Sequence, residues 1–247
     1  DPCEEAKKLA EEIMKDLNSP DVKAKIDKLK ALAKTSKIEV AFKFGTNKAT
    51  GEYKTTDIAT GDASSVSYTY NANGFIAKGS AHIHPLNLDG TPSAGDVYSF
   101  YDDVSTNPDY MYDLVIWNDD IYMLGIVDRD AFNKFVTKYP KSKHYDEETH
   151  GWRKYKSVIG NHYTDILESY YKIYQNKQEA TEAALVSVIS AYKMGIMLQK
   201  WDGSAFRALN GVDAQKKPIS AGSSSSINFG GGNNTTYESI TIKGCNN

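Results

Sequence analysis

The chain has 247 residues, of which 40% are hydrophobic and 25% are charged, and its formal net charge is −3. This length and apolar content allow the core of one large domain or of two small ones. Nucleic-acid-binding domains usually carry a basic excess, so we expect no nucleic-acid partner. No apolar run reaches the roughly 20 residues that span a membrane, so we expect no transmembrane segment.

The two cysteines, Cys3 and Cys245, stand near opposite ends of the chain. Neither has a second cysteine at the spacing of a structural zinc site, which argues against a zinc finger. One interpretation is a disulfide that joins the two ends, and the other is two unrelated thiols. A disulfide would indicate an oxidising compartment, and the start at Asp1 instead of Met is typical of a trimmed form. We therefore expect an exported protein: periplasmic, on the cell surface or secreted.

Two amphipathic helices are predicted at the start of the chain, over 4–17 and 20–34. Apolar residues recur there every three to four positions, with Lys and Glu between them. Ser19 has the residue type of an N-cap, and Pro20 suits the first position of the second helix.

The next hundred residues alternate strand patterns with helix patterns. Period-two alternation marks the strands, and clusters of Asn, Asp and Gly mark the turns. Asn118-Asp119-Asp120 is a tight turn between two apolar segments and predicts a β-hairpin. In chain order, we expect strands over 38–44, 52–60, 66–70 and 75–83, a helix over 93–101, hairpin strands over 113–117 and 121–127, and a helix over 128–139.

The second half of the chain is dominated by helical patterns. Tyr and apolar residues recur at helical spacing, and core packing explains these tyrosines better than a ligand-binding surface does. We expect helices from Trp152 to Tyr174 and over 177–198, paired as an antiparallel hairpin, then a β-hairpin over 195–209, a flexible Gly/Ser/Asn-rich loop over 220–234 and a last strand over 237–242.

These elements predict an α/β fold in which a mixed β-sheet is flanked by helices and followed by a C-terminal helical hairpin extension. We expect three regions. An α/β domain that includes the N-terminal helices covers 1–140, and the helical extension covers 141–200. The region over 201–247 packs its hairpin and terminal strand back on the main domain.

Two histidines and one aspartate form a candidate metal site. His82 and His84 are one residue apart in a strand-like segment, so both imidazoles can face one ion. Asp96 follows a Gly/Pro-containing loop, near the start of a helix. Two imidazoles and one carboxylate are the protein ligands of a catalytic Zn²⁺, with one position left for water. The pKa of such a water falls toward neutrality, and a nearby carboxylate can accept its proton.

The segments His82-Ile-His84-Pro85 and Ser93-Ala-Gly-Asp96 resemble the motif of the JAMM (MPN-plus, JAB-like) zinc metallopeptidases. That motif reads Glu, then H-x-H, then S-x-x-D, and the bacterial RadC-like branch often has H-x-H-P followed by a Gly/Pro-containing loop. The resemblance covers roughly residues 36–130. It implies a JAMM/MPN-like fold with deaminase-like layering.

The resemblance also implies roles for individual residues. His82, His84 and Asp96 would bind zinc, and Ser93 would hold the oxyanion of the tetrahedral intermediate. Glu39, on an early strand, would act as the general base.

The chain departs from the family pattern in two places. Eight residues separate His84 from Ser93, one more than the family most often has. Phe42 stands near the position where the family has a glycine in its Glu-bearing strand, which puts access to the cleft in doubt. Glu52 is the nearest other candidate for the base.

The implied function is the zinc-dependent hydrolysis of peptide or isopeptide bonds in a peptide or protein substrate. Two alternatives are a catalytically silent JAMM-like binding or scaffold module and a secreted effector domain. The P-C-x-x-C, G-x-S-x-G and H-E-x-x-H motifs of other hydrolytic enzymes do not occur. His144 and His150 flank an acidic loop and are expected in solvent, whereas His162 is expected to pack within a helix pair.

Overall fold

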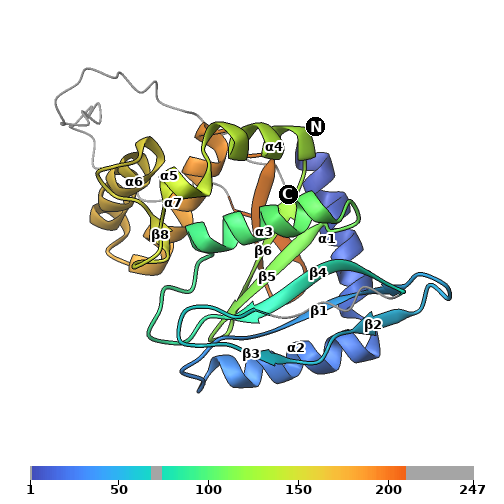
Figure 1. The fold of residues 1–247 in the computed structure, drawn as a ribbon. Coiled ribbons are helices and arrows are strands. Elements are labelled where there is room, and N and C mark those ends of the chain that lie inside the picture. Colours follow the sequence, from blue (N-terminus) through green and yellow to red (C-terminus); the bar gives the residue numbers. More distant parts are fainter. Residues whose placement is uncertain (1, 68–73, 210–247) are drawn as a thin grey trace.

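A computed structural model describes residues 2–67 and 74–209 of the chain. In chain order, the described elements are α1 (Pro2–Leu17), α2 (Pro20–Ala33), β1 (Val40–Asn47), β2 (Tyr53–Thr55), β3 (Ala59–Thr60), β4 (Phe75–Ile83), α3 (Ala94–Thr106), β5 (Tyr112–Trp117), β6 (Asp120–Ile126), α4 (Arg129–Lys138), α5 (Lys141–His144), β7 (Tyr145–Asp146), β8 (Gly151–Trp152), α6 (Val158–Tyr174), α7 (Lys177–Ala191), β9 (Ile196–Trp201) and β10 (Phe206–Ala208). They form a mixed α/β fold in which helices flank a central sheet (Figure 1), so the predicted fold class is confirmed.

The central sheet has eight strands within the described residues. Its order is β10-β9-β6-β5-β4-β1-β2, and β3 also pairs with β1. β4 and β5 are parallel, whereas the other neighbouring strands are antiparallel. A parallel pair needs a long crossover connection, which here contains α3. The chain therefore leaves the sheet at the carboxyl end of β4 and enters α3 a short distance away.

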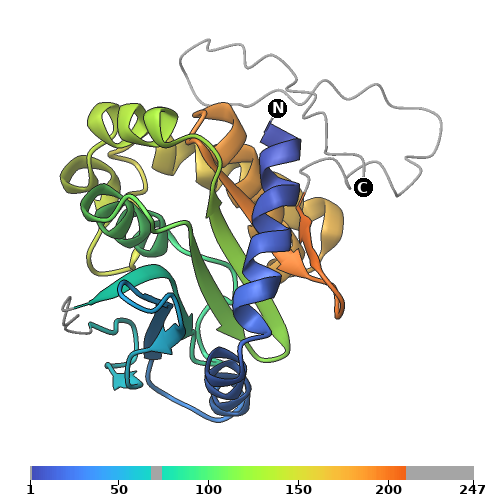
Figure 2. The ribbon, with the colours of Figure 1, turned by 90° about the vertical axis from the view of Figure 1, so that its right-hand side faces the viewer.

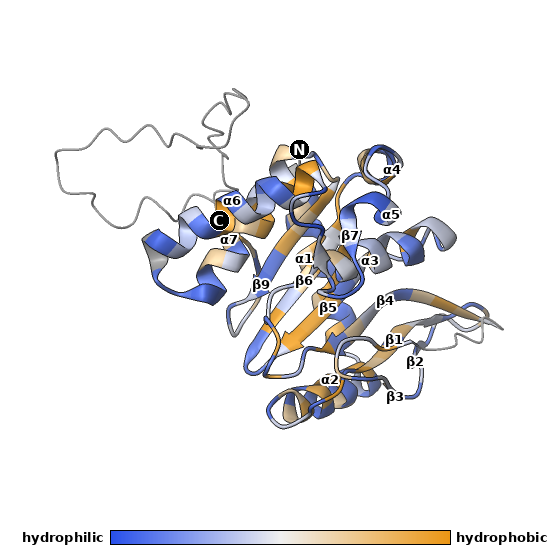
Figure 3. Ribbon diagram, turned by 60° about the vertical axis from the view of Figure 1, so that its left-hand side comes forward, coloured by the Kyte–Doolittle hydropathy of each residue, from blue (hydrophilic) through white to orange (hydrophobic). Residues whose placement is uncertain are grey.

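Each face of the sheet is covered by its own apolar core. One core packs α1 and α2 against alternate residues of the strands, including Phe42, Ile83 and Leu114. The other core packs α3, α4, α6 and α7 against the opposite face, which carries Val115 and Leu124. Because alternate side chains point to opposite faces, a strand covered on both sides is mostly apolar. The colouring of β5 in Figure 3 shows this, and Asp113 is the one charged residue of that strand.

The N-terminal helix α1 lies across the sheet (Figure 2), where Leu9 packs directly over Gly125 of β6. A methyl group at Gly125 would lie 2.1 Å from a methyl carbon of Leu9. The missing side chain of Gly125 therefore lets α1 approach the sheet closely.

Most of the elements predicted for the first 140 residues are confirmed. The hairpin turn at Asn118-Asp119-Asp120 joins β5 to β6, and the helix predicted over 93–101 extends to Thr106. The helices predicted over 4–17, 20–34 and 128–139 are α1, α2 and α4, and the strands predicted over 38–44 and 75–83 are β1 and β4.

Two predicted strands are wrong in detail. The segment 52–60 forms two short strands, β2 and β3, because Thr56 leaves the ladder to bond with Lys43 through its backbone and its side chain. Val66 and Ser67 lie outside any strand, and the rest of the predicted strand 66–70 lies outside the described residues.

The two predicted C-terminal helices are shorter than expected. α6 begins at Val158 instead of Trp152, because Ser157 caps it by accepting a hydrogen bond from the Gly160 N–H. α7 ends at Ala191 instead of 198, because Lys193 has a left-handed backbone with φ 48°. The residues that follow form β9 and β10, which confirms the hairpin predicted over 195–209 and extends the central sheet.

Some predictions concern residues outside the described ranges. The loop over 220–234, the strand over 237–242 and the disulfide between Cys3 and Cys245 all involve residues beyond 209 and stay predictions. The domain boundaries at 140 and 200 also stay predictions. Within 2–67 and 74–209, no helix combines the length and the apolar character that crossing a bilayer requires.

Gly195, directly before β9, packs closely against the backbone at the start of α4, and a substitution tests this contact. Gly195 and Gly51 both have φ 71°, but a Cβ at Gly195 would lie 2.2 Å from the Asp128 carbonyl oxygen, whereas Gly51 has nothing within 4 Å. We expect Gly51→Ala to lower the free energy of unfolding by about 1 kcal/mol, the usual penalty of a left-handed alanine. Gly195→Ala should cost at least about 2 kcal/mol more because the backbone must shift. Urea denaturation of both variants checks this, and equal losses would contradict it.

Candidate metal centre

His82 and His84 lie at the carboxyl end of β4, with Ile83 between them. Ile83 points into the core beneath α2, so both imidazoles face the opposite side of the sheet. Ala41 of β1 and Val115 of β5 flank His82 in the sheet register. The two imidazoles are only 8% and 5% exposed, and their Nε2 atoms are 3.3 Å apart.

Asp96 reaches the two histidines from the first turn of α3. Ser93 is the N-cap of this helix and forms a reciprocal capping box with Asp96. The Ser93 N–H donates to Asp96 Oδ2 at 2.5 Å, and the Asp96 N–H donates to Ser93 Oγ at 3.2 Å. The box fixes the carboxylate so that Oδ1 lies 3.1 Å from His82 Nε2 and Oδ2 lies 3.4 Å from His84 Nε2.

These three side chains have the geometry of a metal site. One donor atom from each of His82, His84 and Asp96 lies within 4.8 Å of the other two. A tetrahedral ion with bonds of 2.0–2.1 Å would place its ligand atoms about 3.3 Å apart. The two Nε2 atoms, 3.3 Å apart, agree with that spacing. Each of them also lies near one oxygen of Asp96: His82 Nε2 is 3.1 Å from Oδ1, and His84 Nε2 is 3.4 Å from Oδ2. The predicted ligands are therefore brought together at a site that could hold a metal ion.

Contacts behind the imidazoles direct both Nε2 atoms toward the centre of the site. His84 Nδ1 lies 2.9 Å from the Asp89 carbonyl oxygen, and a carbonyl only accepts, so Nδ1 carries the hydrogen. His82 Nδ1 faces Asp113 Oδ1 at 3.7 Å. Carbonyl or carboxylate partners of this kind orient the histidine ligands of metals and raise their basicity.

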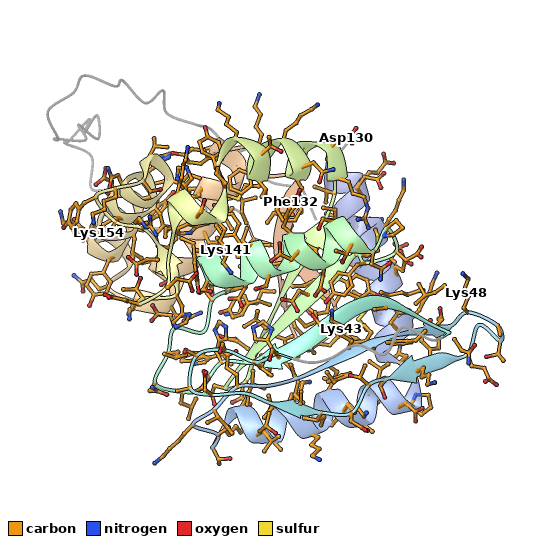
Figure 4. All side chains as sticks on the ribbon, in the orientation of Figure 1. Lys43, Lys48, Asp130, Phe132, Lys141 and Lys154 are labelled. Carbon is orange, nitrogen blue, oxygen red and sulfur yellow. The ribbon has the colours of Figure 1, made fainter. Side chains whose placement is uncertain are left out.

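The carboxylate behind His82 belongs to a buried polar row beneath α3. The Ser80 hydroxyl donates to Asp113 Oδ1, and the Tyr110 hydroxyl donates to Ser80 Oγ at 2.5 Å. Next to them, Lys43 forms a 2.5 Å ion pair with Asp103 of α3, in the space between α3 and the sheet (Figure 4). Buried polar groups need hydrogen-bond partners. Tyr110, Ser80 and Asp113 satisfy one another, so the carboxylate behind His82 is held in place.

The loop between β4 and α3 is also held from outside. Gly90 packs against Trp117, whose ring atoms would lie 2.4 Å from a Cβ at that glycine. Gln178, at the start of α7, donates to Thr91 Oγ1 at 2.8 Å, and Lys177 pairs with Asp89 at 2.6 Å. The start of α7 therefore stabilises the loop that carries the carbonyl partner of His84.

The charges of the site favour a bound cation. Burial lowers the pKa of His82, but Asp113 and Asp96 outweigh it and hold that pKa well above its usual range. Burial likewise lowers the pKa of His84, and Asp96 again raises it overall. Burial raises the pKa of Asp96, but the two imidazoles hold it well below its usual range. Protons and a metal ion therefore compete for the same Nε2 atoms.

The predicted base, Glu39, lies on the same face of the sheet as the histidine pair. Ala41 pairs with His82 in the antiparallel register, and Glu39, two residues before Ala41, shares its face by the alternation of side chains. Its N–H donates to the Asp62 carbonyl oxygen at 2.6 Å, which holds the backbone there. The side chain is 6% exposed.

The environment of Glu39 suits a group that exchanges protons. Burial raises its pKa above the usual range, and the charge of Asp96 adds to this, while His82 and His84 act in the opposite direction. Buried carboxylates with raised pKa values are typical of general bases. Its role as a base stays a prediction.

Ser93 lies beside Asp96 at the start of α3, and its predicted role in holding an oxyanion stays a prediction. Its Oγ accepts the capping hydrogen bond, so its own hydrogen remains to be donated elsewhere. The additional residue between His84 and Ser93 is accommodated in the loop that packs on Trp117.

The other histidines are less exposed than their sequence context suggests. His144 is buried and its Nδ1 lies 2.7 Å from Ser157 Oγ, which corrects the prediction of a solvated loop residue. His150 is half-buried, with its Nδ1 2.9 Å from the Tyr145 hydroxyl. Both predictions fail because 141–157 folds into α5 and the β7–β8 hairpin. His162 packs on Tyr192, as predicted.

Comparison with models of known protein families and with curated proteins finds no match to this chain.

The raised imidazole pKa values predict a pH-dependent metal affinity. Below these pKa values protons occupy the Nε2 atoms, so we expect the apparent affinity for Zn²⁺ to rise with pH. The rise should continue beyond the ordinary histidine pKa of about 6.5 and then level off. Competition titrations against a chromophoric chelator, from about pH 5.5 to 8.5, measure this. An affinity that does not change with pH would contradict it.

Asp113 is expected to matter for metal affinity although it is not a ligand. Asp113→Asn should weaken Zn²⁺ binding about 10- to 100-fold, because His82 loses the negative charge that orients it. Asp103→Asn is the matched control: this carboxylate pairs with Lys43 and does not contact an imidazole. We expect less than about a threefold change there. Equal effects of the two variants would refute a specific role for Asp113.

Proposed function

We propose that this protein is a zinc-dependent hydrolase of peptide or isopeptide bonds, of the JAMM type. One observation carries the proposal: two imidazoles and a carboxylate from adjoining elements converge, with one donor atom of each within 4.8 Å of the other two. Glu39, the fourth acidic or basic group that the motif requires, lies buried on the same face of the sheet. This combination of groups is more specific than any of them alone.

The donor set favours zinc among the common divalent ions. Two imidazole nitrogens and one carboxylate oxygen are a frequent ligand set of catalytic zinc, and they leave one position open. Calcium and magnesium prefer sites made of oxygen donors alone. The 3.3 Å separation of the two Nε2 atoms suits a tetrahedral ion.

Each residue around the site has a separate role in the proposed hydrolysis. An ion held there supplies Lewis acidity, which polarises a carbonyl group and makes water more acidic. Glu39 accepts a proton from the attacking water and later delivers it to the leaving nitrogen, which its raised pKa favours. The Ser93 hydroxyl donates a hydrogen bond to the oxygen that gains charge. Asp113 and the Asp89 carbonyl hold the two imidazoles in place.

The JAMM assignment is part of the proposal. It is supported by the order of the motif along the chain, by the capping box that combines Ser93 with Asp96, and by the position of Glu39 on the sheet face that carries the histidines. Phe42, which raised the question of access, is fully buried in the core on the other face of the sheet. It therefore does not block the side on which the histidines lie.

Replacing Glu39 tests the catalytic role. We expect Glu39→Gln to bind zinc about as tightly as wild type, because it keeps the ligands, and to lose at least about 100-fold in hydrolysis of a peptide library. Glu52→Gln, at an exposed turn, should keep full activity. Mass spectrometry of the products, with metal content measured in parallel, provides the readout.

Two results would count against a hydrolase. Equal activity of wild type and Glu39→Gln would remove Glu39 from the reaction. No hydrolysis by fully zinc-loaded wild type would favour a catalytically silent binding module.

A further inference from the structure

A short hairpin outside the motif brings a hydroxyl group close to the metal centre. Tyr145 begins β7, and Trp152 ends β8, its antiparallel partner. Between them, Asp146 Oδ1 accepts hydrogen bonds from the N–H groups of Glu148 and Thr149 at 3.0 and 3.2 Å. This hairpin is therefore an ordered part of the molecule, although the sequence predicted a solvated acidic loop there.

The Tyr145 side chain reaches the first turn of α3. A Cβ placed on Gly95 would lie 3.4 Å from the Tyr145 hydroxyl oxygen and 3.2 Å from Ser93 Oγ. The two hydroxyl groups therefore flank the same glycine, which directly precedes Asp96. A side chain at Gly95 would fill the space between them.

Tyr145 lies at the same depth as the metal ligands. It is 5% exposed, compared with 5% for His84 and 8% for His82. The ammonium group of Lys141 lies 4.7 Å from the centre of its ring, and Figure 4 labels Lys141 next to α3. A buried hydroxyl needs a hydrogen-bonding partner, and His150 is that partner.

His150 is within hydrogen-bonding distance of the Tyr145 hydroxyl. Its Nδ1 lies 2.9 Å from the Tyr145 oxygen. His150 has a left-handed backbone with φ 51°, a conformation that His and Asn adopt more readily than most residues. With a hydrogen on Nδ1, the imidazole donates to the Tyr145 oxygen and leaves the hydroxyl hydrogen free for another acceptor.

The surrounding charges keep Tyr145 protonated. Burial raises its pKa to about 12, and the carboxylates of Glu147, Asp96 and Glu39 contribute to the increase. Two of these three carboxylates, Asp96 and Glu39, belong to the proposed active site, so the charges of that site act on the Tyr145 hydroxyl. At neutral pH it is a hydrogen-bond donor.

We propose that Tyr145 is a second hydrogen-bond donor to the substrate at this centre, opposite Ser93, and that His150 positions it. The inference rests on the proposed hydrolase function and adds a residue that the motif does not contain. The acceptor is the carbonyl oxygen of an amide, or the oxygen of a carboxylate or hydroxamate that occupies the same place. Two donors on either side of Gly95 would hold that oxygen as it gains negative charge.

The first experiment measures binding and needs no known substrate. Acetohydroxamate is titrated into the zinc-loaded protein by calorimetry. We expect Tyr145→Phe to bind this probe about 10-fold more weakly, because one hydrogen bond to the ligand is lost, while its zinc affinity stays as in wild type. Equal affinity of wild type and Tyr145→Phe for the probe would overturn the proposal.

A matched control separates this role from packing. Tyr98 packs its ring 6.4 Å from that of Tyr145 and donates its hydroxyl hydrogen to the Tyr139 carbonyl oxygen at 2.7 Å. Tyr98→Phe also removes one buried hydroxyl from the same layer, but that hydroxyl does not face Gly95. We expect it to bind acetohydroxamate as wild type does. The same loss in both variants would show that the effect is structural and would refute the inference.

Variants of His150 test the positioning role. His150→Ala should weaken probe binding as much as Tyr145→Phe does, and His150→Asn should restore most of it. Asn tolerates the left-handed backbone and can place a donor near the position of Nδ1. Restoration by Asn supports positioning through a hydrogen bond. If His150→Ala binds the probe as tightly as wild type does, His150 has no part in positioning Tyr145.

Kinetics distinguish failure of this inference from failure of the proposed function. For a cleaved peptide we expect Tyr145→Phe to lower kcat about 10- to 100-fold with KM within about twofold. If Glu39→Gln is inactive and Tyr145→Phe is fully active, only the Tyr145 inference fails. If zinc does not bind, or if Glu39→Gln is as active as wild type, the hydrolase proposal fails and the inference fails with it.

Discussion

The constraint on which the site depends is the concentration of buried negative charge at the end of β4. Glu39, Asp96 and Asp113 are buried or nearly so, and the nearest groups that can balance them are the two imidazoles. Buried carboxylates are costly unless they are paired with positive charge or coordinate a metal. A divalent ion at the Nε2 atoms of His82 and His84 would supply that charge without requiring either imidazole to be protonated.

The rest of the fold serves to hold these groups in register. The parallel pair β4–β5 requires a crossover, and the crossover contains the helix whose first turn carries Asp96. Glu39 directly precedes β1, the neighbour of β4 on the other side, and shares the face of the histidine pair. Beyond the sheet, α7 holds the loop whose Asp89 carbonyl orients His84, and the β7–β8 hairpin brings Tyr145 to the same helix turn. Elements from both halves of the chain therefore converge on one centre.

Sequence patterns predicted the elements well where local signals were strong. The 75–83 strand, the hairpin turn at 118–120 and both N-terminal helices follow from periodicity and turn chemistry. The errors occur where local and tertiary preferences differ. Tyr155 and Lys193 take left-handed conformations that end or delay a helix, and nothing in the periodicity of the flanking residues indicates this. Apolar residues at 196–198 suited a helix but lie in β9, because β6 offers a free edge to pair with.

The sequence by itself determined the candidate metal ligands and the helix cap beside them. His82 and His84 share a strand face because side chains alternate, and Ser93 and Asp96 share a helix start because capping is a local hydrogen-bonding property. Only the tertiary structure decided that Asp113 lies behind His82 and that Tyr145 and His150 approach α3. Those contacts join residues from separate elements, and their closeness arises from strand order and helix packing, which no short-range pattern encodes.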